Sequence, residues 1–207
     1  MMNDVVVKEI KQQKNPGLFS IITEDGFEFS LTAKGIYENS VRVGSTFTQS
    51  QFNKIKDYAS QESSYRYAVY LLGRRDWSSG EMIKKLTEKG KHAEQTVEKL
   101  INQGYINDKE YSKKIIDKYI KKYGKKRIEE ELYKRYLPKE LWRDELDTRC
   151  CDMTEQILKH LAKKMKNNPF TDRKERDKIY AYFVRQGYSY ENITKAFNEY
   201  NNGDFDD

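Results

Sequence analysis

The chain has 207 residues and a formal net charge of +6, with 35% charged and 37% hydrophobic residues. This balance disfavours one extensive hydrophobic core and favours several thin cores, each with a wide solvated surface. The first 60 residues hold seven Lys/Arg and seven Asp/Glu, so the positive excess lies in residues 61–207. A basic surface of this kind attracts polyanions, which include nucleic acid, an anionic membrane and an acidic protein.

Targeting and redox signals are sparse. No apolar run approaches the roughly 18 residues that span a bilayer, and Met1-Met2-Asn3-Asp4 lacks the charged and apolar regions of a signal peptide. We therefore expect a cytoplasmic protein with no membrane contact. Cys150 and Cys151 are adjacent, which is poor geometry for a disulfide and offers too few ligands for a metal. We expect two reduced thiols, one packed and one exposed.

Residues 1–48 are predicted to form a small β-rich module, because apolar and polar side chains alternate between strong turn signals. The turn signals are Asn15-Pro16-Gly17 and Glu24-Asp25-Gly26, and the second contains the Asp-Gly pair favoured in tight hairpins. The expected elements are an extended run from Val5 to near Lys11, strands at Leu18–Ile22 and Phe27–Leu31, a short helix at 33–38, and a return to the sheet at Val41–Phe47.

A linker helix is expected at residues 49–62, because Thr48 and Gln51 fit a capping box, in which each side chain satisfies a free backbone donor. Beyond it, strand signals almost vanish. Residues 63–107 predict a first three-helix repeat. Its signals are an apolar stripe from Tyr65 to Leu72, a cap made by Ser78 and Glu81, a helix end at Gly90, a helix start at Glu94 and a second end at Gly104.

The helical pattern recurs at offsets of 46 and 51 residues. Each copy has an apolar anchor, a helix end four residues later and an acid near the next helix start, where partial positive charge favours acids. The copies are Leu86…Gly90…Glu94, Leu132…Tyr136…Glu140 and Phe183…Gly187…Glu191. They predict an elongated array, with a second three-helix repeat at 108–150 and a third at 151–207 that ends in a disordered acidic tail, Asp204-Phe205-Asp206-Asp207. Chance alignment of unrelated helical hairpins remains an alternative.

Signals of catalysis are few. His92 and His160 are far apart and neither stands in a metal-ligand spacing, so we interpret both as solvated or capping residues. The glycines form no phosphate-binding loop, and Glu129-Glu130-Glu131 is typical of charge balance on a helix surface. We therefore expect a protein that is not an enzyme and holds no metal or cofactor.

The strongest local signal is the segment Tyr111–Arg127, in which Asp117 is the only acid. Its basic residues are Lys113, Lys114, Lys118, Lys121, Lys122, Lys125, Lys126 and Arg127. Apolar residues at helical spacing occupy the opposite face: Tyr111, Ile115, Ile116, Tyr119, Ile120 and Tyr123. A helix of this kind can follow a phosphate backbone while its cations displace condensed counterions. The alternative is an ordinary solvated face.

Further basic groups are expected to extend this surface: Arg74, Arg75, Lys84, Lys85, Lys163 and Lys164, with Lys166 nearby. The sequence contains 16 tyrosines, which could stack on bases, but most lie on apolar stripes. We therefore interpret the tyrosines chiefly as core residues.

These residues carry a resemblance to a known family. The first repeat of the bacterial RecX regulatory proteins resembles segment 67–112, with Leu71-Leu72-Gly73-Arg74-Arg75-Asp76-Trp77-Ser78-Ser79-Gly80-Glu81 followed by Lys85-Leu86 and Gly90. Gly104-Tyr105-Ile106-Asn107-Asp108 with Tyr111-Ser112 is similar to another segment of that family, although Asn107 stands where Asp is usual. Gly124-Lys125-Lys126-Arg127-Ile128 resembles the start of the second helix of its middle repeat. The likeness covers most of the chain.

The resemblance implies a row of three-helix units that binds in the groove of the RecA recombinase filament on single-stranded DNA. It implies interference with ATP hydrolysis, strand exchange and co-protease activity in recombination, DNA repair and the SOS response. The expected partners are RecA and single-stranded DNA, with double-stranded DNA as a further possibility, and the expected state is a monomer.

A different class of function is a transcriptional regulator built from helix-turn-helix-like units, in which one helix reads the major groove. Such a helix would be rich in Arg, Asn and Gln. The candidate third helices at 93–103, 139–149 and 190–200 are mixed or acidic, which disfavours this alternative. An enzyme acting on nucleic acid would need a carboxylate cluster or metal site that the sequence does not indicate.

Overall fold

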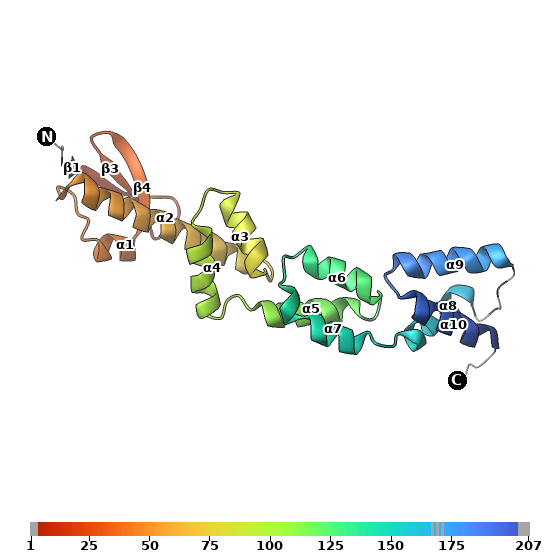
Figure 1. Ribbon diagram of the computed structural model, residues 1–207. Coiled ribbons are helices and arrows are strands. Elements are labelled where there is room, and N and C mark those ends of the chain that lie inside the picture. Colours follow the sequence, from red (N-terminus) through yellow and green to blue (C-terminus); the bar gives the residue numbers. More distant parts are fainter. Residues whose placement is uncertain (1–3, 167, 169, 171, 203–207) are drawn as a thin grey trace. The chain divides into compact units, whose positions relative to one another are not determined.

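The computed structural model describes residues 4–166, 168, 170 and 172–202, which form two compact units (Figure 1). The first unit comprises the described residues through Asp76 together with Met82–Tyr105, and the second comprises Trp77–Glu81 together with the described residues from Ile106 onward. The expected acidic tail, Asp204–Asp207, lies outside the described residues. The protein is mainly helical, with a small N-terminal β module, as the sequence predicts.

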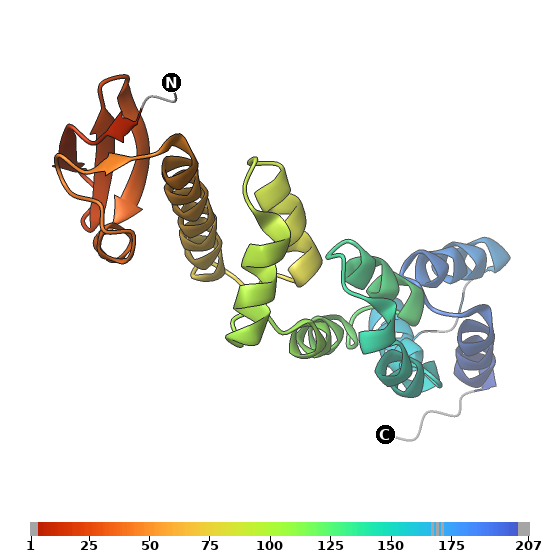
Figure 2. The same ribbon diagram turned by 60° about the vertical axis from the view of Figure 1, so that its left-hand side comes forward.

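The N-terminal module contains an antiparallel sheet of order β2-β3-β4 and a separate β1–β5 pair (Figure 2). Both predicted turns contain a glycine with positive φ, Gly17 and Gly26. The expected return to the sheet at Val41–Phe47 shortens to two residues, which pair with β1 and not with the main sheet. The elements are β1 (Val5–Val6), β2 (Glu9–Gln12), β3 (Leu18–Thr23), β4 (Gly26–Thr32), α1 (Ala33–Glu38) and β5 (Thr46–Phe47).

Helix α2 (Gln49–Leu72) begins at the predicted capping box, in which Thr48 and Gln51 satisfy each other's backbone donors. The expected linker helix does not end near residue 62, because no Gly or Pro interrupts the next turns and α2 continues into the first predicted repeat. Its first half closes the core of the β module, where Phe52 packs 5.3 Å from Phe29 between ring centroids.

Helices α3 (Ser79–Thr87) and α4 (Ala93–Asn102) follow the predicted signals. Ser78 Oγ accepts the Glu81 N–H at 3.0 Å, and Glu81 accepts the Ser78 N–H at 3.2 Å, which confirms the predicted cap. Gly104 ends the α4 segment with φ +76°. His92 stands at the start of α4, and its N–H donates to Ser64 Oγ at 3.1 Å.

The second unit contains two groups of three α-helices, around one continuous core that includes Trp142 and Phe183. Ser78 Oγ donates a hydrogen bond to the Arg135 carbonyl, and Asp108 accepts both the N–H and the hydroxyl of Ser79. The elements are α5 (Asp108–Tyr119), α6 (Lys125–Tyr133), the 3-10 turn η1 (Lys139–Leu141), α7 (Arg143–Arg149), α8 (Thr154–Met165), α9 (Arg173–Arg185) and α10 (Tyr190–Asn202).

The three aligned helix ends share one backbone feature. Gly90, Tyr136 and Gly187 all have positive φ, at +61°, +53° and +88°. Left-handed residues of this kind commonly end helices. The conformation of Tyr136 shows that a non-glycine residue in the middle copy still ends its helix in the same way.

Gly124 and Gly187 let two helix ends of the second unit approach backbone closely. Gly124 precedes α6 and its N–H donates to the Gln186 carbonyl at 2.9 Å, while the Lys126 N–H donates to the Gly187 carbonyl at 3.1 Å. A Cβ on Gly124 would lie 2.2 Å from the Tyr188 nitrogen, and one on Gly187 would lie 2.3 Å from the Arg127 nitrogen. The residues after α9 therefore cap the start of α6.

Asp152 supports the start of α8 by two contacts. Its carboxylate accepts the Thr154 N–H at 2.8 Å and pairs with Lys195 of α10 at 2.8 Å. The Lys195 ammonium and the Thr154 hydrogen bonds hold the pKa of Asp152 well below its usual range.

Replacing Asp152 with alanine is expected to destabilise the protein by about 1 kcal/mol at pH 7, the usual net contribution of one hydrogen bond. Because folding lowers the pKa of this carboxyl, its contribution is present above the unfolded-state pKa of about 4 and is lost as the pH falls below that value. Thermal unfolding of the wild type and of Asp152→Ala should show a difference in the midpoint temperature at pH 7 that becomes smaller toward pH 3. A constant difference would contradict this role.

Candidate nucleic-acid interface

The fourteen basic residues that the sequence singles out all lie at least partly at the surface. The first unit holds four of them: Arg74, Arg75, Lys84 and Lys85. The second unit holds the other ten: Lys113, Lys114, Lys118, Lys121, Lys122, Lys125, Lys126, Arg127, Lys163 and Lys164. Each group is therefore described within its own unit.

In the first unit, Arg74 and Arg75 follow the end of α2. Arg74 donates to the Tyr70 hydroxyl at 2.8 Å and lies 5.5 Å from the centre of that ring. Arg75 donates to the Asp76 carbonyl at 2.7 Å. Lys85, on α3, pairs loosely with Glu88 at 3.5 Å.

The periodicity of segment 111–127 predicts one basic helix, which is wrong, whereas the family resemblance correctly places the start of a second helix at Gly124. Helix α5 ends at Tyr119 and α6 begins at Lys125, so the cations are divided between two helices and a turn. The chain must turn here because Gly124 docks on the residues after α9.

The expected lack of balancing acids is also only partly correct, because three of the eight cations find acids outside the segment. Their ion pairs are Lys113–Glu110 at 3.1 Å, Lys125–Asp147 at 2.8 Å and Arg127–Glu130 at 2.8 Å. These pairs reduce the charge that the three residues offer to a ligand.

Within segment 111–127, four exposed lysines form no ion pair with a described residue: Lys118, Lys121, Lys122 and Lys126. Lys118 lies 5.3 Å from the centre of the Tyr119 ring. Lys126 stands in the first turn of α6, where the helix dipole repels a cation. These lysines add little to stability, so they are the best candidates for contact with a polyanion. We call them the turn lysines.

The second unit brings one of the turn lysines, Lys121, close to α8. The His160 ring forms a hydrogen bond with the Lys121 backbone. Burial lowers the pKa of His160, and this hydrogen bond raises it by less. Tyr188 bridges nearby, since its hydroxyl accepts from Gln156 at 2.6 Å and lies 3.5 Å from His160 Nδ1. Lys164 is one helical turn after His160, so two basic groups that are separate in sequence share this region. His160 is half-buried and bonds to the backbone just beyond the end of α5, so it is not freely solvated, and the alternative of a capping residue is not contradicted.

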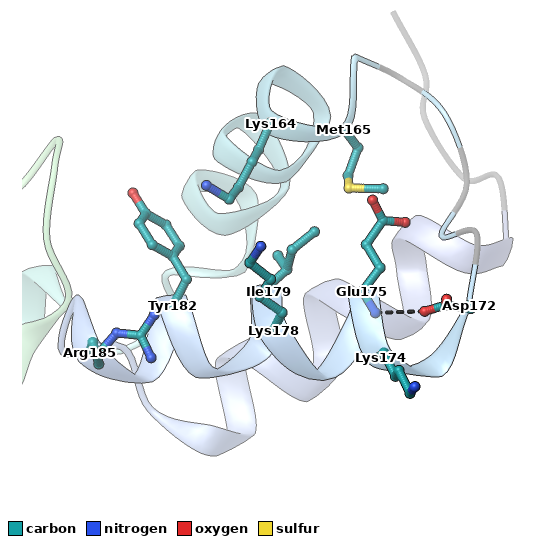
Figure 3. Close-up of a pocket in the computed structure, with 9 residues that line it drawn as sticks. All are labelled: Lys164, Met165, Asp172, Lys174, Glu175, Lys178, Ile179, Tyr182 and Arg185. Carbon is teal, nitrogen blue, oxygen red and sulfur yellow. Dashed lines mark hydrogen bonds between the residues drawn. The ribbon is translucent and has the colours of Figure 1, made fainter.

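A groove beside this region includes basic residues that the sequence prediction missed. It lies between the end of α8 and α9, and Figure 3 shows its side chains. The missed residues that line it are the basic residues Lys174, Lys178 and Arg185 and the aromatic residue Tyr182. Their helical spacing was the available signal, together with nine Lys/Arg against three Asp/Glu in residues 159–185.

The two cysteines, the candidate metal ligands and the apolar character of the helices also bear on what the chain can bind. Cys150 is buried, which raises the pKa of its thiol to about 11, and Cys151 is exposed, so the expected contrast is confirmed. Among the described residues, no group of three or more His, Cys, Asp or Glu could hold a metal. None of the described helices combines the length and apolar character needed to cross a bilayer.

The tyrosines are less buried than predicted. Two of the 16 are buried, eight are half-buried and six are exposed, so the interpretation of tyrosines chiefly as core residues is wrong for the exposed ones. The exposed residues are Tyr37, Tyr70, Tyr105, Tyr133, Tyr136 and Tyr190.

Comparison with known proteins points to one family. A family model described as RecX, third three-helix domain, matches residues 152–197. Regulatory protein RecX of Vibrio parahaemolyticus is 30% identical over 146 residues, which cover 68% of this chain and 94% of that protein. Regulatory protein RecX of Caldanaerobacter subterraneus is 25% identical over 199 residues, which cover 94% of this chain and 98% of that protein.

Solved structures share the fold. A crystal structure of regulatory protein RecX matches with a TM-score of 0.67 at 18% identity, covering 94% of this chain and 100% of that one. RecX from Lactobacillus salivarius matches with a TM-score of 0.57 at 22% identity, covering 68% of this chain and 96% of that one. RecX proteins are regulators and not enzymes. The similarity to curated relatives over most of their length, together with the shared fold, shows that this chain belongs to the RecX family of regulatory proteins.

Proposed function

We propose that this protein binds the RecA filament on single-stranded DNA and inhibits its ATPase, strand-exchange and co-protease activities, acting as a cytoplasmic monomer in recombination and DNA repair. Family membership supports RecA as the partner. The observation that carries the DNA contact is the group of turn lysines, which are exposed and without acidic partners among the described residues. Cations of this kind bind phosphates by releasing condensed counterions, without preference for sequence.

The remaining predicted cations support this proposal to different degrees. Lys163 and Lys164 lie on the same unit as the turn lysines, while Lys125 and Arg127 are engaged by acids. A filament groove offers both protein surface and phosphates, so we propose that exposed tyrosines such as Tyr133 contribute protein contacts.

The test is the DNA-stimulated ATPase of RecA on single-stranded DNA as this protein is titrated in. We expect the rate to fall toward the DNA-independent level, with less inhibition at high salt because the phosphate contacts are screened. RecA without DNA serves as the control for a direct effect on the enzyme. An unaffected rate at a stoichiometric excess of this protein would contradict the proposal.

The transcriptional-regulator alternative is weakened by the charge at the starts of the third helices. Helix α4 has Glu94 in its first turn, α7 has Asp144 and Glu145, and α10 has Glu191. A recognition helix directs its N-terminal residues into the major groove, where carboxylates are repelled by the flanking phosphates. Selection of a consensus duplex from random DNA would favour the alternative instead.

A further inference from the structure

The groove between α8 and α9 has a volume of about 610 Å³ and lies wholly within the third group of helices. Lys164 and Met165 line it from α8, and Ile179 and Tyr182 line it from α9 (Figure 3). Met165 and Ile179 are largely buried, so they form an apolar floor below the charged rim.

The rim carries more positive than negative charge. Lys174, Lys178 and Arg185 of α9 form no ion pair among the described residues. Two acids also line the groove, Asp172 and Glu175, but Asp172 is occupied as the cap of α9, where it accepts the Glu175 N–H at 2.8 Å. The excess of cations over acids makes the rim complementary to a chain of phosphates.

An aromatic ring stands among these cations. The Lys164 ammonium lies 4.2 Å from the centre of the half-buried Tyr182 ring, and Figure 3 shows it reaching from α8 toward that ring. Cations that follow a backbone, combined with an aromatic ring on which a base can stack, are the usual means of binding single-stranded nucleic acid. A duplex keeps its bases paired and stacked, so it cannot offer one to Tyr182.

We propose that this groove binds a segment of single-stranded DNA, with phosphates on Lys174, Lys178 and Arg185 and a base displacing Lys164 from Tyr182. The proposal rests on the proposed function only for the choice of DNA over RNA. The binding itself requires no recombinase. The third group of helices thereby holds a nucleic-acid site whose residues differ from the turn lysines.

The test is fluorescence anisotropy of the full chain with a labelled oligothymidylate of about 20 nucleotides, a length that exceeds common single-strand site sizes. The groove variant is Lys174→Gln/Lys178→Gln/Arg185→Gln. The matched control is Lys159→Gln/Arg173→Gln/Arg176→Gln, which removes the same charge from α8 and α9 but not from the groove. We expect the groove variant to bind at least tenfold more weakly, with the salt slope reduced by roughly 2. The control should stay within about twofold of the wild type, since general screening alone affects it.

Three results would overturn the proposal: equal losses in groove variant and control, no loss in the groove variant, or an equal loss for a matched duplex. If circular dichroism shows that the groove variant is misfolded, the double variant Lys174→Gln/Lys178→Gln replaces it. Its affinity for the oligonucleotide is then compared with that of Arg173→Gln/Arg176→Gln, and equal losses of affinity would overturn the proposal. Tyr182→Leu should weaken single-strand binding and leave duplex binding unchanged, and an equal effect on both would count against base stacking. The RecA ATPase assay tests the proposed function separately from the groove. A loss of oligonucleotide binding that is confined to the groove variant would support the groove site even if this protein left the RecA ATPase rate unchanged.

Discussion

Gly187→Ala is expected to lower the free energy of unfolding of the second unit by about 2 to 4 kcal/mol. The residue has φ +88°, where an L side chain costs about 1 kcal/mol. The new Cβ would also lie 2.3 Å from the Arg127 nitrogen and 2.7 Å from the Arg127 Cβ. Relieving that overlap requires α6 and the residues after α9 to separate, and overpacking of this kind costs about 1 to 3 kcal/mol. Urea denaturation followed by tryptophan fluorescence measures the effect, because Trp142 is buried in the same core.

Gly104→Ala is the matched control for this prediction. Gly104 has φ +76°, but no atom lies within 4 Å of the position of a new Cβ. Gly104→Ala should therefore lower the free energy of unfolding only by the backbone cost of about 1 kcal/mol. Equal losses at the two positions would show that the close approach of Gly187 to α6 contributes nothing.

Reversing the charge of the four turn lysines, in Lys118→Glu/Lys121→Glu/Lys122→Glu/Lys126→Glu, is expected to weaken binding to RecA–single-stranded DNA filaments by on the order of 100-fold or more. Four phosphate contacts would be lost and four repulsions gained. Helix content should be unchanged, because these side chains are exposed and Glu at position 126 suits the start of α6. Sedimentation of the protein with preformed filaments at several salt concentrations measures the affinity and its salt slope.

The control variant places the same charge change in the N-terminal module and the start of α2, at Lys11, Lys14, Arg42 and Lys54. These four cations are exposed and lie in the electrically neutral part of the sequence. Binding should fall only slightly in the control. If both variants weakened binding equally, the effect would follow from net charge, and the turn lysines would be an ordinary solvated face.

Features encoded by neighbouring residues were predicted well. The caps at Thr48 with Gln51 and at Ser78 with Glu81 are both formed, because a capping box joins residues only three positions apart. The short helix expected at 33–38 is present as α1.

The break between α5 and α6 could not be read from periodicity. Apolar residues continue at helical spacing through Tyr119, Ile120 and Tyr123, so the pattern favours one long helix. All three side chains are indeed half-buried, but the last two lie beyond the end of α5 in the turn. The turn forms because backbone groups near Gly124 bond to residues some sixty positions away.

Local sequence therefore sufficed for the helical class, the β module, the caps, the helix ends at Gly90, Gly104 and Gly187, and the uneven distribution of charge, since each depends on residues within a few positions. Distant residues also decide which basic side chains lack an acidic partner, as the ion pair between Lys125 and Asp147 shows. The groove between α8 and α9 likewise exists only where two helices meet, and no spacing within either helix could place Lys164 over Tyr182. Tertiary packing decides these features because an ion pair or a groove requires two surfaces that the chain brings together only when it folds.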